Sequence, residues 1–258
     1  MPLDLLPPDR SRLERSPLEL VVFQVRYENR LVVSDPAVAL AVHEVLGGPS
    51  GPYGRIDPAE GTSLSVAVGT GPTAVSESKL SGWRLVGDDG WVVSLMPDHV
   101  GLETTAYTTW DEFEPRLHGL LDAVQEHVEP AIEQRIGLRY VDQIRELQIA
   151  DAAGWEPYIR PELLGPILHP QFGPAVRATF QQVLVELERG VTCGLRHGTA
   201  QNETGTMDYV LDYDVFREGG RGFDPAAIKA AASAFNTYAL QLFQASITET
   251  LFDLLGRE

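Results

Sequence analysis

Apolar and polar residues alternate along several short stretches of the chain, a pattern typical of β-strands that bury one face. The first stretch runs from Leu18 to Glu28, and its alternate apolar residues are Val21, Phe23, Val25 and Tyr27. The same alternation predicts further strands in the first half of the chain, at Ser63–Val68, Trp83–Val86, Trp91–Leu95 and Val100–Thr105. The sequence Gly87-Asp88-Asp89-Gly90 predicts a hairpin turn. Residues 47 to 62 are rich in glycine and proline, so we predict a loop there.

Two helices are predicted in the first half from their start signals. Asp35 is a capping residue before Pro36 at the first helical position, and this helix should end near Leu46. Thr109 and Glu112 have the spacing of a capping box, so a second helix should begin there. The apolar residues of this second helix recur at helical spacing and predict its buried stripe: Phe113, Leu117, Leu120, Leu121, Val124 and Val128.

The second half of the chain repeats this order of elements. Its first strand is Arg135–Ile144, which we predict to be the central strand of the protein. A loose region, Asp151–Gly173, follows, and its prolines allow only a short helix. Alternation then predicts three strands, at Thr179–Glu188, Val191–His197 and Asp208–Phe216. A helix of about 30 residues should begin at Asp224-Pro225 and end at Gly256.

A short sequence match indicates a duplication. Arg26-Tyr27 in the first strand aligns with Arg139-Tyr140 in the central strand, and Asn29 aligns with Asp142. We therefore predict an α+β fold made of a duplicated β-α-β-β-β-α unit, with antiparallel sheets covered on one face by the long helices. The expected parts are an extended arm over residues 1–17, a first repeat over 18–130 and a second repeat over 131–258, packed as one globular unit.

Charge and cysteine content restrict the function classes. The chain has 258 residues, and 37 acidic against 20 basic residues give a net charge of −17. A surface this negative repels phosphate backbones, so we expect no direct contact with nucleic acid. The single cysteine, Cys193, allows no internal disulfide and no thiolate zinc cage. The chain shows neither a membrane-length apolar run nor a signal peptide, so we expect a soluble cytoplasmic protein, either a monomer or a homodimer.

Several segments occur in an order that resembles a known bacterial family. They are Gly82–Phe113, the motif GLRY within Arg135–Ile144, Leu211–Phe216 and Phe243–Gly256. That family is sporadically distributed, has about the length of this chain, and brings no assigned function or accepted catalytic residues. The resemblance implies a soluble bacterial protein whose gene is mobile or defence-associated, with phage defence as one such role. Two positions depart from the family pattern, because Asp142 stands where asparagine is usual and Asn236 stands where histidine is expected.

Charged residues on the predicted strands supply the candidate sites. Three carboxylates share one face of the last predicted strand: Asp208, Asp212 and Asp214. Three guanidinium groups alternate onto one face of the central strand: Arg135, Arg139 and Arg145. The carboxylates could bind a divalent cation, but ion pairing between the two rows across neighbouring strands is the favoured alternative, and we expect no metal site. The arginines could instead line a groove for anions, with Arg26 and Arg139 as the best candidates.

Asp142 is unusual because it falls on the apolar face of its strand together with Tyr140, and Asn29 is expected to do the same in the first strand. A buried carboxylate must find partners or bind a proton, so we predict that Asp142 caps a helix end, with a general base as the alternative. Cys193 and His197 are about 13 Å apart along an extended strand, too far for a thiol–imidazole dyad. No metalloprotease, phosphate-loop or serine-hydrolase motif occurs, and we expect no cofactor.

These observations favour a non-enzymatic binding protein over an enzyme. It would be an accessory, chaperone-like or neutralising partner of another bacterial protein, and its acidic composition indicates a basic partner. The alternative is an enzyme or small-ligand receptor whose pocket lies between sheet and helices and is lined by Arg139, Tyr140 and Asp142. The candidate residues for binding a ligand or partner are Arg26, Arg139, Tyr140, Asp142, Asp212 and Asp214.

Overall fold

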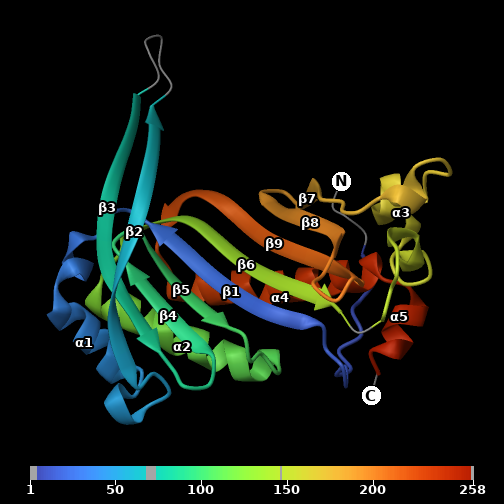
Figure 1. Ribbon diagram of the computed structural model, residues 1–258. Helices are drawn as coiled ribbons and strands as arrows, with labels where there is room; N and C mark the ends of the chain where they lie inside the picture. The colour runs from blue at the N-terminus through green and yellow to red at the C-terminus, as the bar shows by residue number, and fades with distance from the viewer. Residues whose placement is uncertain (1–4, 68–73, 146, 257–258) are drawn as a thin grey trace. The chain divides into compact units, whose positions relative to one another are not determined.

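The computed structural model of the chain describes residues 5–67, 74–145 and 147–256. Within these ranges nine strands form one antiparallel sheet with the order β2-β3-β4-β5-β1-β6-β9-β8-β7 (Figure 1). The strands are β1 (Leu18–Tyr27), β2 (Arg55–Ala67), β3 (Ala74–Val86), β4 (Trp91–Met96), β5 (His99–Thr104), β6 (Ile132–Ile144), β7 (Gln181–Glu188), β8 (Val191–Gln201) and β9 (Met207–Gly222). The α-helices are α1 (Pro36–Val45), α2 (Trp110–His127), α3 (Pro161–Leu164), α4 (Pro225–Ser246) and α5 (Glu249–Leu254).

The α+β class is therefore confirmed, and the predicted central strand is β6, an interior strand between β1 and β9. Short 3-10 helices complete the secondary structure at Leu31–Ser34, Gly48–Ser50, Ala152–Trp155, Gly165–Leu168 and Gly173–Ala175. The duplication and the covering of one sheet face by the long helices stay predictions. Val68, at the end of one predicted strand, lies outside the described residues.

The chain divides into two compact units. Unit 1 consists of Met1–Val21, Gly137–Glu218 and Ala231–Glu258, and unit 2 consists of Val22–Ile136 and Gly219–Ala230. Both units draw residues from both predicted repeats, so the boundaries at residues 17 and 130 stay predictions. Strands β1, β6 and β9 each contribute residues to both units.

The starts of the first two helices, both in unit 2, lie where the sequence predicts them. The Asp35 carboxylate accepts a hydrogen bond from the Ala37 amide at 2.9 Å at the start of α1. The Thr109 hydroxyl accepts one from the Glu112 amide at 3.3 Å at the start of α2. Each cap satisfies an amide that has no partner inside its helix, which fixes where the helix begins.

The core of unit 2 contains the predicted stripe of α2, which is buried along its length. The ring of Phe113 in this stripe packs against Trp91 of β4, with ring centres 5.5 Å apart. Tyr27 at the end of β1 is buried as well, and its hydroxyl donates a hydrogen bond to the Met96 carbonyl at 2.8 Å. The tyrosine ring can be buried because its hydroxyl group keeps a hydrogen-bond acceptor inside the protein.

The prediction of a loop over residues 47 to 62 is wrong in its second part. Strand β2 begins at Arg55, includes Pro58, and pairs with β3 along its whole length. Proline cannot donate a ladder hydrogen bond, but β2 is the last strand of the described sheet, so Pro58 needs no donor on its outer side. Strand β3 also begins earlier than predicted, at Ala74, and pairs with β4 only from Trp83 onward.

The long C-terminal helix predicted from residue 224 to 256 is interrupted in the structure. Helix α4 ends at Ser246 and α5 begins at Glu249. Between them, the Thr248 amide donates to the Tyr158 carbonyl at 2.9 Å, and the Thr248 hydroxyl accepts from the Leu251 amide at 3.4 Å. A tertiary hydrogen bond therefore replaces the helical one at this point, and Thr248 restarts the helix as a cap.

The N-terminal arm runs along the same helices, within unit 1. The Asp9 backbone exchanges two hydrogen bonds with the Gln244 side chain of α4, at 3.0 and 2.6 Å. The amides of Glu14 and Arg15 donate to carbonyls at the end of α5, each at 2.9 Å. The described part of the arm is thus held by backbone hydrogen bonds to the last two helices.

Gly198 in β8 provides a test of packing in unit 1, because it lies against the segment before β7. A Cβ atom at this position would lie 2.0 Å from the Thr179 carbonyl oxygen. Backbone cannot yield as a flexible side chain can, so we predict that Gly198→Ala lowers the free energy of unfolding by about 1–3 kcal/mol. Gly222→Ala is the control, since a Cβ atom there meets nothing within 4 Å. Urea denaturation compares the two variants, and equal stabilities would contradict this packing.

Candidate functional site

An ion pair joins β6 to β9 within unit 1. It lies on the sheet face that carries the side chain of Arg139, which we call the open face. The guanidinium of Arg139 donates two hydrogen bonds to the two carboxylate oxygens of Asp212, each at 2.7 Å. The Asp212 side chain is only 8% exposed, whereas that of Arg139 is 38% exposed. The hydrogen bonds that Arg139 donates to Asp212 raise the pKa of Arg139 above its ordinary value. This geometry confirms the predicted pairing of the central strand with the aspartates of β9.

Arg196 of β8 extends this pair into a charged row. Its guanidinium lies 3.5 Å from a carboxylate oxygen of Asp212 and 3.7 Å from one of Asp214. Asp212 thus lies between two arginines from the strands on its two sides. The two aspartates singled out in the sequence therefore each lie within ion-pair distance of an arginine.

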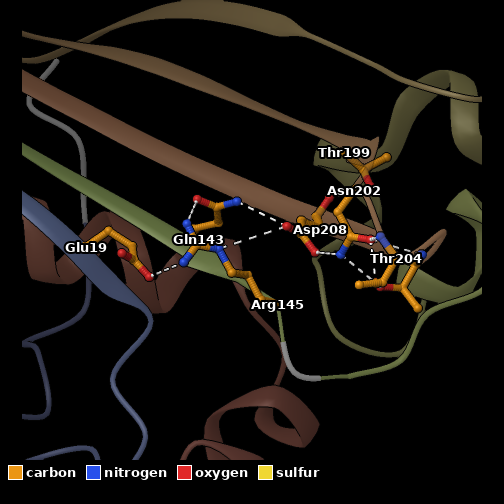
Figure 2. A network of polar contacts seen from close by, with 8 residues as sticks. Glu19, Gln143, Arg145, Thr199, Asn202, Thr204 and Asp208 are labelled. Carbon is orange, nitrogen blue, oxygen red and sulfur yellow. Dashed lines mark hydrogen bonds and ion pairs between the residues drawn. The ribbon is translucent and has the colours of Figure 1, made fainter.

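Asp208, the third aspartate of this face, belongs to a second network (Figure 2). Its carboxylate accepts hydrogen bonds from Gln143 at 3.1 Å and from Asn202 at 2.7 Å. Arg145 lies 4.0 Å from the same carboxylate and donates a hydrogen bond to Glu19 of β1 at 2.9 Å. Figure 2 shows these side chains converging on Asp208 from β6 and from the turn between β8 and β9. The network therefore ties the ends of three strands together.

The opposite face of β6 carries the other two candidates from the central strand. The Tyr140 hydroxyl donates a hydrogen bond to the Asn236 side chain of α4 at 2.9 Å, and both residues are buried. Asp142 is 6% exposed, and no hydrogen bond or ion pair joins its carboxyl group to another side chain in the described part of the chain. Burial, with a smaller contribution from the charge of Asp212, raises the pKa of Asp142 to about 8. Asp142 is thus predominantly protonated at neutral pH.

The structure does not bring Arg139, Tyr140 and Asp142 together in one pocket. Successive side chains of a strand point to opposite faces, so Arg139 lies on the face away from the other two. Asp142 caps none of the described helices, because the carboxyl group lies within the core of unit 1 rather than at a helix start. Asn29 is exposed, since β1 ends at Tyr27 before the alternation reaches it.

Two further candidates from the sequence have local partners. Arg26 belongs to unit 2, is exposed, and donates a hydrogen bond to the neighbouring Gln24 side chain at 3.2 Å. His197 is hydrogen-bonded to the Tyr209 hydroxyl at 3.0 Å, whereas burial raises the pKa of the Cys193 thiol to about 12. A thiol with this pKa is not a nucleophile at neutral pH, so the two residues form no dyad.

Sequence reasoning missed a pocket in unit 1 of about 440 Å³. The N-terminal arm, the end of β6 and helix α5 form it, and the charged lining residues are Glu14, Arg15, Glu19 and Arg145. Its apolar wall is formed by Leu147, Leu251, Leu254 and Leu255. No sequence signal links these three distant segments. Only the expectation that the N-terminal arm is ordered could have indicated that a pocket forms beside it. The volume is within the range of small-molecule sites.

Neither a match to a known protein, nor a metal site, nor a membrane-spanning helix is found for the described part of the chain. No family model, no curated protein and no solved structure matches the chain. Across residues 5–67, 74–145 and 147–256, no three histidine, cysteine or acidic side chains are arranged to hold a metal ion. None of the helices in these ranges has the length and apolar character to cross a bilayer. The resemblance to the GLRY family stays a prediction.

The buried carboxyl of Asp142 predicts a specific pH dependence of stability. Its pKa is about 8 in the folded protein against an ordinary value of 3.8, so the folded state retains a proton that the unfolded state loses. The contribution of this group is fully present below about pH 4 and is lost as the pH rises to about 8, at no more than about 1.4 kcal/mol per pH unit. Asp142→Asn should remove that loss, so the variant gains stability relative to wild type across this window.

Thermal and urea denaturation between pH 4 and 9 measure this difference. The exposed Glu156→Gln serves as the control and should follow the wild-type profile. Parallel profiles for wild type and Asp142→Asn would show that the carboxyl group is solvated in the folded protein.

The ion pair of Arg139 predicts a second difference in stability. Arg139→Ala leaves the nearly buried Asp212 carboxylate without its two 2.7 Å hydrogen bonds, and we expect a loss of about 1–3 kcal/mol in the free energy of unfolding. The matched control is Arg84→Ala, which breaks an ion pair with Glu103 whose side chains are 50% and 36% exposed. That loss should stay under about 1 kcal/mol. Losses of the same size in both variants would refute the distinction.

Proposed function

We propose that the protein is a non-enzymatic cytoplasmic binding protein that engages another, more basic bacterial protein as an accessory, chaperone-like or neutralising partner. The observation that carries this proposal is a group of exposed apolar side chains at the β7 edge of unit 1. Phe180 is 75% exposed, Leu184 67% and Val183 44%. These side chains lie within five residues of one another along the chain, with Val183 and Leu184 on opposite faces of the strand, and burial against a partner would remove them from water.

The state of the chemically capable residues supports a binding role over a catalytic one. The arginines and aspartates of the open face neutralise one another, and Asp212 is held by two guanidinium groups. Cys193 is buried with a raised pKa, and Asp142 is enclosed in the core. These groups are engaged in holding the fold, whereas the apolar side chains at β7 are not. The acidic chain, with its charge of −17, favours a partner of opposite charge.

A second candidate function rests on the pocket between the N-terminal arm, β6 and α5. The arginines Arg15 and Arg145 and the glutamates Glu14 and Glu19 offer groups of both signs beside an apolar wall, with Arg145 and Glu19 paired to each other. A small molecule that carries both charges and an apolar part would suit this lining. This candidate is a small-ligand receptor, and it differs from the sequence prediction in the residues that form the pocket.

One experiment separates the two functions. The tagged protein is purified from its native host, and mass spectrometry identifies the proteins and small molecules that remain bound. We expect a single protein in stoichiometric amount, with a pI above 7, which rebinds as a purified component in size-exclusion chromatography. Recovery of a small molecule without any protein would contradict the proposal and support the pocket. Recovery of neither would contradict both.

A further inference from the structure

We propose that strand β7 accepts an extended, basic segment of a partner protein as an additional strand of the sheet. This inference rests on the proposed binding function and names its surface. Strand β7 is the last strand in the sheet order and pairs with β8 alone among the described strands. Its outer edge therefore offers backbone N–H and C=O groups to an incoming strand, which is the basis of recognition by strand addition.

The exposure of Leu184 has a local cause. Leu184 lies directly opposite Gly194 of β8, so it has no cross-strand side chain to pack against. Leu184 is therefore more exposed than Val183, whose register partner is Leu195. An incoming strand would supply the missing neighbour on the outer side of Leu184. The site thus combines unpaired backbone groups with an apolar side chain that a partner would bury.

The two edges of the sheet differ in how they are protected. At the other edge, the first part of β2 contains Asp57, Pro58 and Glu60, features that oppose strand addition. In β7 such features occur only at the end, where the register shifts between Glu186 and Glu188. The stretch before them, QVLV at residues 182–185, contains neither charge nor proline. This part of the β7 edge therefore remains open to pairing.

The start of β7 sets the other limit of the site. The Gln181 side chain donates a hydrogen bond to the Leu163 carbonyl of α3 at 3.0 Å. Helix α3 therefore lies beside the first residue of β7 and limits the site there. The open stretch runs from Gln182 to Glu186, about 16 Å of extended strand. A short segment of about five residues would fill it, which suits a linear motif of a partner more than a whole sheet.

The side chains of this stretch specify the chemistry of the segment. On one face Leu184 is followed two residues later by the exposed Glu186, and on the other face lie Val183 and Val185. In an antiparallel pair, the residue opposite Glu186 should be lysine or arginine, and the next three, opposite Val185, Leu184 and Val183, should be apolar. The expected segment is therefore one basic residue followed by three β-branched or aliphatic residues. A second copy of this chain fits less well, because two molecules of charge −17 repel each other.

A synthetic peptide tests the assignment directly. The probe is an acetylated, amidated peptide Thr-Lys-Val-Leu-Val-Thr, titrated into the full chain at millimolar concentration and followed by amide NMR. We expect shift changes confined to β7 and its neighbour β8. Replacing the lysine of the peptide by glutamate should weaken binding about threefold, the size expected for one exposed ion pair. No shift change, changes elsewhere, or equal affinities of the two peptides would overturn the proposal.

Backbone methylation distinguishes strand addition from apolar contact alone. Only alternate N–H groups of an added strand face β7, so N-methylation of one alternate set should abolish binding and methylation of the other set should preserve it. Equal effects of the two sets would overturn strand addition.

Substitution of the surface provides the matched variants. Leu184→Lys places a charge on the open edge and should weaken peptide binding more than tenfold. Leu40→Lys, at a residue of α1 that is 53% exposed, should leave binding unchanged. Sedimentation equilibrium of both variants identifies the other occupant, because a dimer lost only in Leu184→Lys would show that a second copy binds β7 and would overturn a basic partner.

Purification from the native host tests the assignment of the site to β7 separately from the proposed binding function. If the partner is recovered with wild type and Leu40→Lys but lost with Leu184→Lys, both stand. If it is recovered equally with all three, the binding function stands and the assignment to β7 falls. If no protein is recovered with wild type, the binding function itself falls.

Discussion

The paired hydrogen bonds between Arg139 and Asp212 are the interaction on which the rest of unit 1 depends. They join β6 to β9 at 2.7 Å and hold a carboxylate that is only 8% exposed. Side chains alternate along a strand, so a slip of one residue would separate this pair and turn Asp142 toward the open face. The pair therefore fixes the register that encloses Asp142 and leaves the hydroxyl of Tyr140 within reach of Asn236.

The same pairing decides which surface is left for binding. Charged groups that neutralise one another across a sheet already have ion-pair partners within the protein. A ligand that contacts them therefore gains little additional binding free energy. Asp208 is engaged as well, by hydrogen bonds from the neutral side chains of Gln143 and Asn202. At β7 the situation is reversed, since Leu184 faces Gly194 and the outer edge has no strand beside it in the described sheet. The binding site that we propose therefore lies at the sheet edge rather than on the charged face of the sheet.

Alternation of apolar and polar residues predicted the faces of β1, β6 and β9, and start signals predicted the helix caps, because these depend on local spacing alone. The arginine–aspartate pairing also required β6 and β9 to be neighbours, which the sequence analysis assumed and the structure shows. The first part of β2, residues 55 to 62, escaped prediction, since Pro58 is compatible with a strand only at an edge, and edge position is a tertiary property. The break before Thr248 depends on a hydrogen bond to Tyr158, 90 residues earlier. Burial of Asp142 was predicted but its capping role was not realised, because a single sequence does not give the position of a strand relative to distant helix ends.

The central claim is that a partner completes the sheet at β7, and amide hydrogen exchange of the complex purified from the native host tests it most directly. An added strand would supply acceptors to the outward-facing amides between Gln182 and Glu186. Our account predicts that exchange at alternate amides of this stretch slows by at least about a hundredfold when the partner is bound, while the edge of β2 is unchanged. Unchanged exchange along β7 in a stoichiometric complex would contradict it.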